Sequence, residues 1–130
     1  MSTRSFRLSL LAEGLAVCRL PLDSDLQIWF LGDPFFAMLR SGNELTIVCA
    51  QEKVPAEVQR EPGWRALKID GVFAFNETGV LESILKPLAQ ANIGIFALSS
   101  FDTDYVLVKS EDVEKASRAL EGAGHTIVIR

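Results

Sequence analysis

The sequence predicts an α+β protein made of two ferredoxin-like βαββαβ units in tandem, the first of them shorter and degenerate. In the second half of the chain, apolar runs of strand length alternate with amphipathic helical segments in the order β-α-β-β-α-β. The first half repeats part of that order, with strands and a short helix but almost no second helix. The chain has 130 residues and is 48% hydrophobic, which is enough to bury a core. We therefore expect antiparallel sheets with helices on one face, and domains at 1–60 and 61–130.

The first half begins with two strands. Apolar runs at 6–11 and 15–20 are separated by the turn residues Glu13 and Gly14, a spacing that fits a hairpin. The segment 26–31 is apolar and does not distinguish helix from strand.

A helix and a third strand follow. Gly32-Asp33-Pro34 predicts a helix start, with Asp33 as the N-cap and Pro34 in the first helical position, so we expect a short helix over 34–40. Residues 44–50 predict a strand. The polar segment 51–63 holds two prolines and is the best candidate for a linker, with one helical turn near 56–59.

The second half has clearer periodicity. A strand is predicted at 64–70 and a loop at 71–78. The helix at 79–91 presents leucine and isoleucine at positions i, i+3, i+4 and i+7, and Pro87 within it predicts a kink or a late break. The helix stripe consists of Leu81, Ile84, Leu85 and Leu88.

The remaining elements complete the ferredoxin-like order. An apolar strand at 93–99 and a strand at 105–109 flank the polar turn 101–104. Ser110 is the predicted N-cap of a second helix, which ends at glycines 122 and 124. A last strand is predicted at 125–130.

The composition argues against several classes of function. The net charge is -4 with no basic run, so we expect no nucleic-acid partner. No segment approaches the ~20 apolar residues of a membrane span, and the apolar run near the N-terminus is too short for a secretory signal, so we expect a cytoplasmic protein without membrane contact. Cys18 and Cys49 lie in strand-like runs and are expected to be buried, reduced thiols.

Catalytic and metal-binding patterns are not found in the sequence. No His/Cys cluster has zinc spacing, and no glycine-rich phosphate-binding motif occurs. The single histidine, His125, begins a strand, where a structural role is expected. The aromatic residues, among them Phe73, Phe75 and Phe101, are assigned to the core or to an interface. We therefore expect no catalytic residues, no metal and no cofactor, and we do not expect an enzyme.

Three segments of the second half carry a resemblance to a known family. GWRALKIDG, ETGVLESILKPLAQANI and FALSSFDTDYVLVK resemble the ACT domain, the regulatory module of aspartate kinases and other enzymes of amino-acid metabolism. In the first half, AVCRLPLDS, Trp29 and ELTIVCAQEKVP resemble the first half of small bacterial tandem-ACT proteins, which are similar to the CASTOR arginine sensors. The resemblance covers most of the chain and is more specific in the second half.

The resemblance implies that the chain senses a small molecule, in particular an amino acid, between ACT-like domains, and that it forms a homodimer. The ligand would lie where the loop after the first strand meets the second strand of a paired domain. In the arginine sensors an acidic loop residue and an aspartate hold the basic side chain of the ligand, and Glu77 and Asp104 match these positions. The predicted ligand-binding residues are Asn76, Glu77, Thr78, Gly79, Val80, Ile93, Gly94, Ile95, Ser99 and Asp104.

The chemistry of these residues leaves alternatives open. Gly79 at a helix start permits an anion such as an α-carboxylate to approach the backbone N–H groups, or it permits only a tight turn. Glu77 would pair with a ligand cation, or it is a solvated loop carboxylate. Ser99 would donate to a ligand, or it caps a strand end. Asp102 is assigned to a turn that bonds its own backbone.

Three functions compete. The first is a stand-alone regulatory module that binds an amino acid. The second is a protein–protein interaction or oligomerisation module without a ligand, favoured by the apolar content and the exposed sheet edges. The third is an enzyme, which would require Asp102, Asp104, Glu77 and His125 to converge on one cleft.

Overall fold

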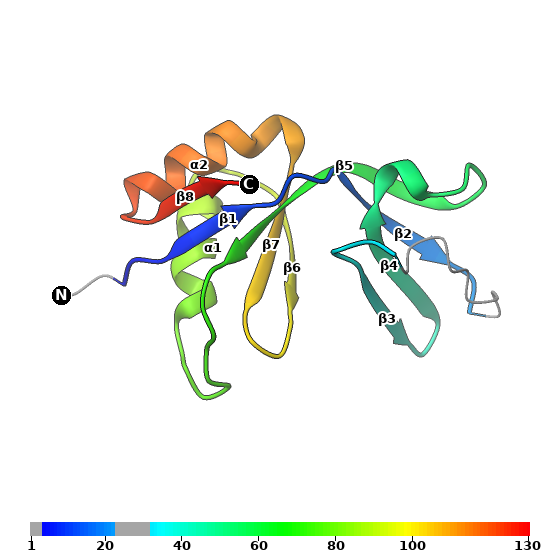
Figure 1. Cartoon of the computed structure of the whole chain (residues 1–130), viewed down its shortest axis with the longest axis horizontal. Coiled ribbons are helices and arrows are strands. Elements are labelled where there is room, and N and C mark those ends of the chain that lie inside the picture. The colour runs from blue at the N-terminus through cyan, green and yellow to red at the C-terminus, as the bar shows by residue number, and fades with distance from the viewer. Residues whose placement is uncertain (1–3, 23–31) are drawn as a thin grey trace. The chain divides into compact units, whose positions relative to one another are not determined.

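The protein divides into two compact units. The structure is a computed structural model that describes residues 4–22 and 32–130. Unit 1 contains residues 1–12 and 65–130, and unit 2 contains residues 13–64 (Figure 1). The α+β, ferredoxin-type class predicted from the sequence is confirmed. The expected boundary near residue 60 is close to the change of unit at residue 64, but the N-terminal strand belongs to unit 1.

Unit 1 contains five strands of an eight-stranded sheet, in the order β6-β7-β5-β1-β8. Its strands are β1 (Arg7–Leu10), the second part of β5 (Gln59–Ile69), β6 (Ile95–Ser99), β7 (Asp104–Lys109) and β8 (Thr126–Ile129). β6 pairs with β7 in antiparallel register, with Ile95 opposite Val108 and Ser99 opposite Asp104. The turn between them, which ends at Thr103, is fixed because the Thr103 hydroxyl donates to the carbonyl of Ile69 over 2.5 Å.

The strand β1 lies between β5 and β8. Leu8 is opposite Ile69 in an antiparallel pair and opposite Ile127 in a parallel pair. The predicted hairpin of 6–11 with 15–20 is therefore wrong, because the apolar face of β1 completes the core of unit 1 instead. The sheet is accordingly not antiparallel throughout.

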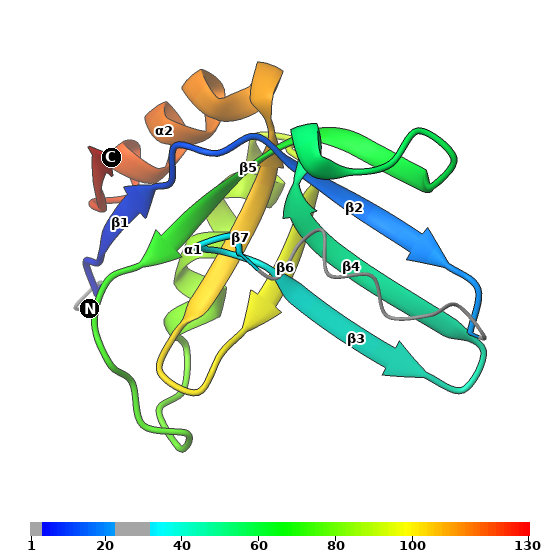
Figure 2. The ribbon, with the colours of Figure 1, turned by 45° about the vertical axis from the view of Figure 1, so that its right-hand side comes forward.

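Two helices cover one face of this sheet (Figure 2). They are α1 (Val80–Gln90) and α2 (Val113–Gly122). The second helix starts after a 3-10 turn, Ser110–Asp112, so Asp112 rather than the predicted Ser110 occupies its N-cap position. The helices and strands enclose one core, formed by Leu8, Leu10, Leu67, Ile69, Val80, Ile84, Leu88, Ile93, Val106, Val108, Ala116 and Leu120.

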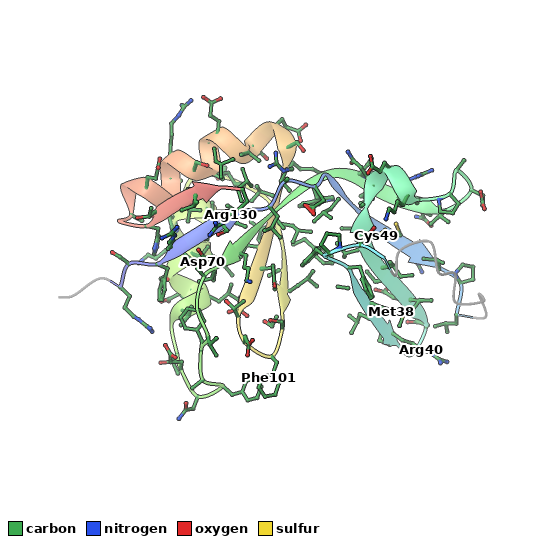
Figure 3. All side chains as sticks on the ribbon, in the orientation of Figure 1. Met38, Arg40, Cys49, Asp70, Phe101 and Arg130 are labelled. Atoms are coloured by element: carbon green, nitrogen blue, oxygen red, sulfur yellow. The ribbon has the colours of Figure 1, made fainter. Side chains whose placement is uncertain are left out.

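Unit 2 is an antiparallel sheet in the order β3-β4-β2-β5. Its strands are β2 (Leu15–Leu20), β3 (Ala37–Ser41), β4 (Glu44–Ala50) and the first part of β5. The strands at 15–20 and 44–50 match the predicted bounds. Cys18 and Cys49 are both free and buried in its core, as expected. Figure 3 labels Cys49. The S–H contact with Cys18, together with burial, raises the pKa of the Cys49 thiol above its ordinary range.

The helix predicted at 34–40 is wrong, because this segment forms β3 and pairs with β4. Ala37 is opposite Val48, and Ser41 is opposite Glu44 across a two-residue turn. The carboxylate of Asp33 caps no helix. It accepts a hydrogen bond from the N–H of Ala50 at 3.1 Å and forms an ion pair with Lys53 at 2.5 Å. The ion pair raises the pKa of the Lys53 ammonium.

Two other expectations for the first half have different outcomes. The predicted linker 51–63 holds a 3-10 turn, Gln51–Lys53, and then enters β5 at Gln59, so most of it is ordered structure rather than a linker. The ambiguous segment 26–31 lies outside the described residues. No helix in the described part of the chain is long and apolar enough to cross a membrane.

Candidate functional site

The predicted loop residues meet at the N-terminus of α1. Gly79 is the N-cap residue, and its φ of 81° is in the left-handed region that favours glycine. No side chain caps this helix. A Cβ atom built on Gly79 would meet nothing within 4 Å. Gly79 therefore serves the turn conformation, and it leaves the first turn of α1 open to solvent, where the N–H groups and the helix dipole favour an anion.

The loop before α1 is tied to the turn between β6 and β7. The N–H of Phe73 donates to the carbonyl of Asp102 at 2.8 Å. Within that turn, Ser100 and Thr103 exchange backbone and hydroxyl hydrogen bonds of 2.8–3.2 Å. Two segments far apart in the sequence therefore form one edge of unit 1, and Phe101 stands at its tip (Figure 3).

A pocket with a volume of about 360 Å³ lies along this edge. Phe75 and Phe101 are 78% and 79% exposed, and their rings meet edge to face with centroids 4.9 Å apart. The volume falls near the lower end of the range for small-molecule pockets. The pocket is lined by Val72, Phe73, Ala74, Phe75, Phe101 and Asp102. Of the two roles expected for Phe75 and Phe101, the core is wrong, because both side chains are exposed, and the interface remains a prediction.

Glu77 is bound to another part of the same chain. Its Oε2 accepts from Nη2 of Arg4 at 2.8 Å, and its Oε1 accepts from the N–H of Ala74 at 3.2 Å. These two hydrogen bonds, that of Arg4 first, lower the pKa of the Glu77 carboxyl. Arg4 also donates to the carbonyl of Thr78 at 3.2 Å. Glu77 is thus an exposed carboxylate that is paired with Arg4, a partner that reasoning from the sequence missed.

The other predicted residues separate into two groups. Ser99 and Asp104 face each other at the end of the β6–β7 pair, and the Ser99 hydroxyl donates to the Asp104 carboxylate at 2.5 Å. Ile93 is buried in the core, and Ile95 packs against it. Residues 93–95 follow the C-terminus of α1, whose 11 residues span about 16 Å. The structure thus places Asn76–Val80, Ser99 and Asp104 at one end of unit 1, and Ile93, Gly94 and Ile95 at the other.

His125 has a structural role. Its Nδ1 accepts from the N–H of Phe6 at 3.0 Å, which makes Nε2 the protonated nitrogen, and Nε2 donates to the carbonyl of Ser83 at 3.0 Å. Both ring nitrogens are occupied by backbone groups, and the side chain is buried. Within residues 4–22 and 32–130, no three His, Cys, Asp or Glu residues are grouped closely enough to hold a metal ion.

Comparisons with known proteins agree with this architecture. A family model described as an ACT domain matches residues 59–122, and a second family model, described as an N-terminal domain, matches residues 13–57. The crystal structure of protein Atu0741 from Agrobacterium tumefaciens is 37% identical in sequence and superposes with a TM-score of 0.92. That alignment covers 98% of this chain and 96% of the other.

More distant relatives carry functional names. Human CASTOR3P is 27% identical over 99 residues, which are 66% of this chain and 61% of that protein. Subunit 1 of the rat cytosolic arginine sensor for mTORC1 is 28% identical over 88 residues, 62% of this chain and 27% of that protein. The present chain thus covers less than two thirds of either relative. The regulatory subunit of aspartate kinase from Thermus thermophilus shares the fold, with a TM-score of 0.62, 14% identity and coverage of 86% and 93%.

Proposed function

The chain belongs to the ACT-domain family, and from this premise we propose that it is a regulatory module that binds an amino acid at the loop before α1. The observation that carries the proposal is one loop with two features: its residues 72–75 line the pocket of about 360 Å³, and it ends at the uncapped N-terminus of α1. An α-carboxylate suits the free N–H groups of the first helical turn. The apolar walls of the pocket suit the remainder of a small ligand.

The names of the relatives point in the same direction. One is an arginine sensor, and another is the regulatory subunit of an aspartate kinase. The role we propose for this chain is likewise regulatory rather than catalytic. Its one histidine supports that role, because both ring nitrogens are committed to backbone partners and neither is available as a base.

We further propose that the site is completed by a second copy of the chain. In one copy, Asn76–Val80 and Ile93–Ile95 lie at opposite ends of α1 and cannot touch the same small ligand. Two copies that present opposite ends to each other would place both segments around one ligand. A homodimer is the assembly that this arrangement requires.

A thermal-unfolding panel with the twenty amino acids tests the proposed function. A ligand at 100 times its Kd stabilises the folded state by about 2.7 kcal/mol. We therefore expect a clear rise in Tm with at least one amino acid at millimolar concentration. A panel in which no amino acid raises Tm would contradict amino-acid binding and favour the alternative, an interaction module without a ligand.

Substitution of Gly79 distinguishes an effect on ligand binding at the loop from a general loss of stability. Gly79→Ala places a Cβ in a left-handed conformation and is expected to destabilise the protein by about 1–2 kcal/mol. Gly63→Ala is a matched control, because Gly63 has a φ of 85° and also has open space around its Cβ position, but lies in β5 of unit 2. Both variants should lose similar stability in urea unfolding. Only Gly79→Ala should reduce the rise in Tm caused by the amino acid. An equal rise in both variants would contradict a binding site at the loop before α1.

A further inference from the structure

The guanidinium of Arg4 binds three groups around the loop before α1. Its Nη2 lies 2.8 Å from Oε2 of Glu77, its Nη1 donates to the carbonyl of Thr78 at 3.2 Å, and its central carbon lies 4.8 Å from the ring centroid of Phe6. An isolated surface ion pair contributes little to stability. Here a backbone carbonyl and an aromatic face orient the same guanidinium, so the position of the charge is defined.

The backbone before β1 is held in place next to this loop. The N–H of Phe6 donates to Nδ1 of His125, and the Phe6 ring stacks on the His125 ring with centroids 5.8 Å apart. The same ring meets Phe73 edge to face at 5.7 Å. Arg4 is two residues from this anchored position. The structure thus directs a cation from the N-terminal segment onto the acidic residue of the loop.

Both carboxylate oxygens of Glu77 already have a partner within the chain. Oε2 is paired with Arg4, and Oε1 accepts the N–H of Ala74. An ammonium or guanidinium group that takes the position of Arg4 at Oε2 exchanges one charge pair for another and gains little. A ligand without a positive side chain meets no such competition, because its carboxylate uses the N–H groups of α1.

We propose that Arg4 is a built-in occupant of the cation position at Glu77 and that it makes the site select against amino acids with a positively charged side chain. This inference rests on the proposed function, and it narrows the ligand class to neutral or acidic amino acids. The resemblance to the arginine sensors had implied the opposite, a basic side chain at Glu77.

Carbon-13 NMR of the Glu77 side-chain carboxyl, assigned by its loss in Glu77→Gln, tests the competition without knowledge of the natural ligand. L-arginine is the probe. In Arg4→Ala, the Glu77 signal should respond to L-arginine at a concentration roughly five- to tenfold lower than in the wild type. The Arg4→Met variant, which keeps an apolar stem against Phe6, guards against loss of the fold. The pKa of Glu77 should also rise in both variants, because the largest cause of its depression is removed.

Arg7→Ala is the matched control, because it removes the same charge three residues away while Arg7 contacts Asp70 rather than Glu77. It should leave the response of Glu77 to L-arginine unchanged. The inference is overturned if the Glu77 signal of Arg4→Ala and Arg4→Met responds to L-arginine as in the wild type, or fails to respond in all three proteins. It is also overturned if Arg7→Ala lowers the required L-arginine concentration as much as Arg4→Ala does. The proposed function is tested separately: it fails if no amino acid raises the Tm of the wild type in the thermal-unfolding panel.

Discussion

Replacing Leu88 by alanine is expected to lower the free energy of unfolding by about 2–5 kcal/mol. The Leu88 side chain is fully buried in the core of unit 1, and its removal leaves a cavity that the surrounding strands and helices fill only in part. The carbonyl of Leu88 also accepts the N–H groups of Ala91 and Ile93, so the residue ends α1 as well as packing it. Urea unfolding followed by circular dichroism measures the loss.

Leu85→Ala provides the control for this prediction. It deletes the same atoms from the same helix, but Leu85 is only half-buried at the edge of that core. Its loss should be about 1 kcal/mol, typical of a substitution outside the core. Equal losses at both positions would mean that helix propensity rather than packing determines the stability of α1.

The success at α1 shows which part of the fold is encoded locally. The spacing of Leu81, Ile84, Leu85 and Leu88 predicts the helix and its inner face, and the structure buries Ile84 and Leu88 with Leu81 and Leu85 beside them. The periodic pattern is sufficient here because an amphipathic helix of this length needs only one apolar partner surface.

The failure at β3 shows the opposite case. Asp33-Pro34 is a local helix-start signal, but the segment after it gains a full set of hydrogen bonds from β4 when it is extended. Asp33 meanwhile satisfies the buried N–H of Ala50. The turn Gly42-Asn43 between two apolar runs was the available signal for a hairpin, and it outweighs a single N-cap. Pairing between segments decided the structure, and local propensity did not.

The partners of strand β1 and of the loop site could not be predicted from the sequence for a different reason. Leu8 pairs with Ile69 and Ile127, and Arg4 pairs with Glu77, across large separations in the sequence. Periodicity predicts that 6–11 is a strand but does not specify its neighbours. The loop Asn76–Val80 was predicted from the resemblance of a contiguous segment to the ACT domain, whereas its partner Arg4 and the facing turn at Phe101 required the fold.

The largest polar effect is expected from His125→Phe, which should lower the free energy of unfolding by about 2–5 kcal/mol. Phenylalanine keeps an aromatic ring beside Phe6, but it leaves the N–H of Phe6 and the carbonyl of Ser83 without their partners. His125→Asn retains an acceptor near the Nδ1 position, and His125→Gln retains a donor near Nε2, so each should recover part of the loss. Urea unfolding of the four proteins gives the comparison, and equal stability of all three variants would contradict the two-bond account.

Pro87 explains why a histidine is needed at position 125. In a regular helix the carbonyl of Ser83 would accept from the N–H of residue 87, and proline has none. Nε2 of His125 supplies that missing donor at 3.0 Å, and α1 continues through Pro87 to Gln90. Pro87→Ala restores a donor within the helix, so His125→Phe should be less destabilising in that background by about 1 kcal/mol or more. A double-mutant cycle measures this coupling. Strictly additive losses in the free energy of unfolding would contradict the claim that Pro87 makes the Ser83 carbonyl depend on His125.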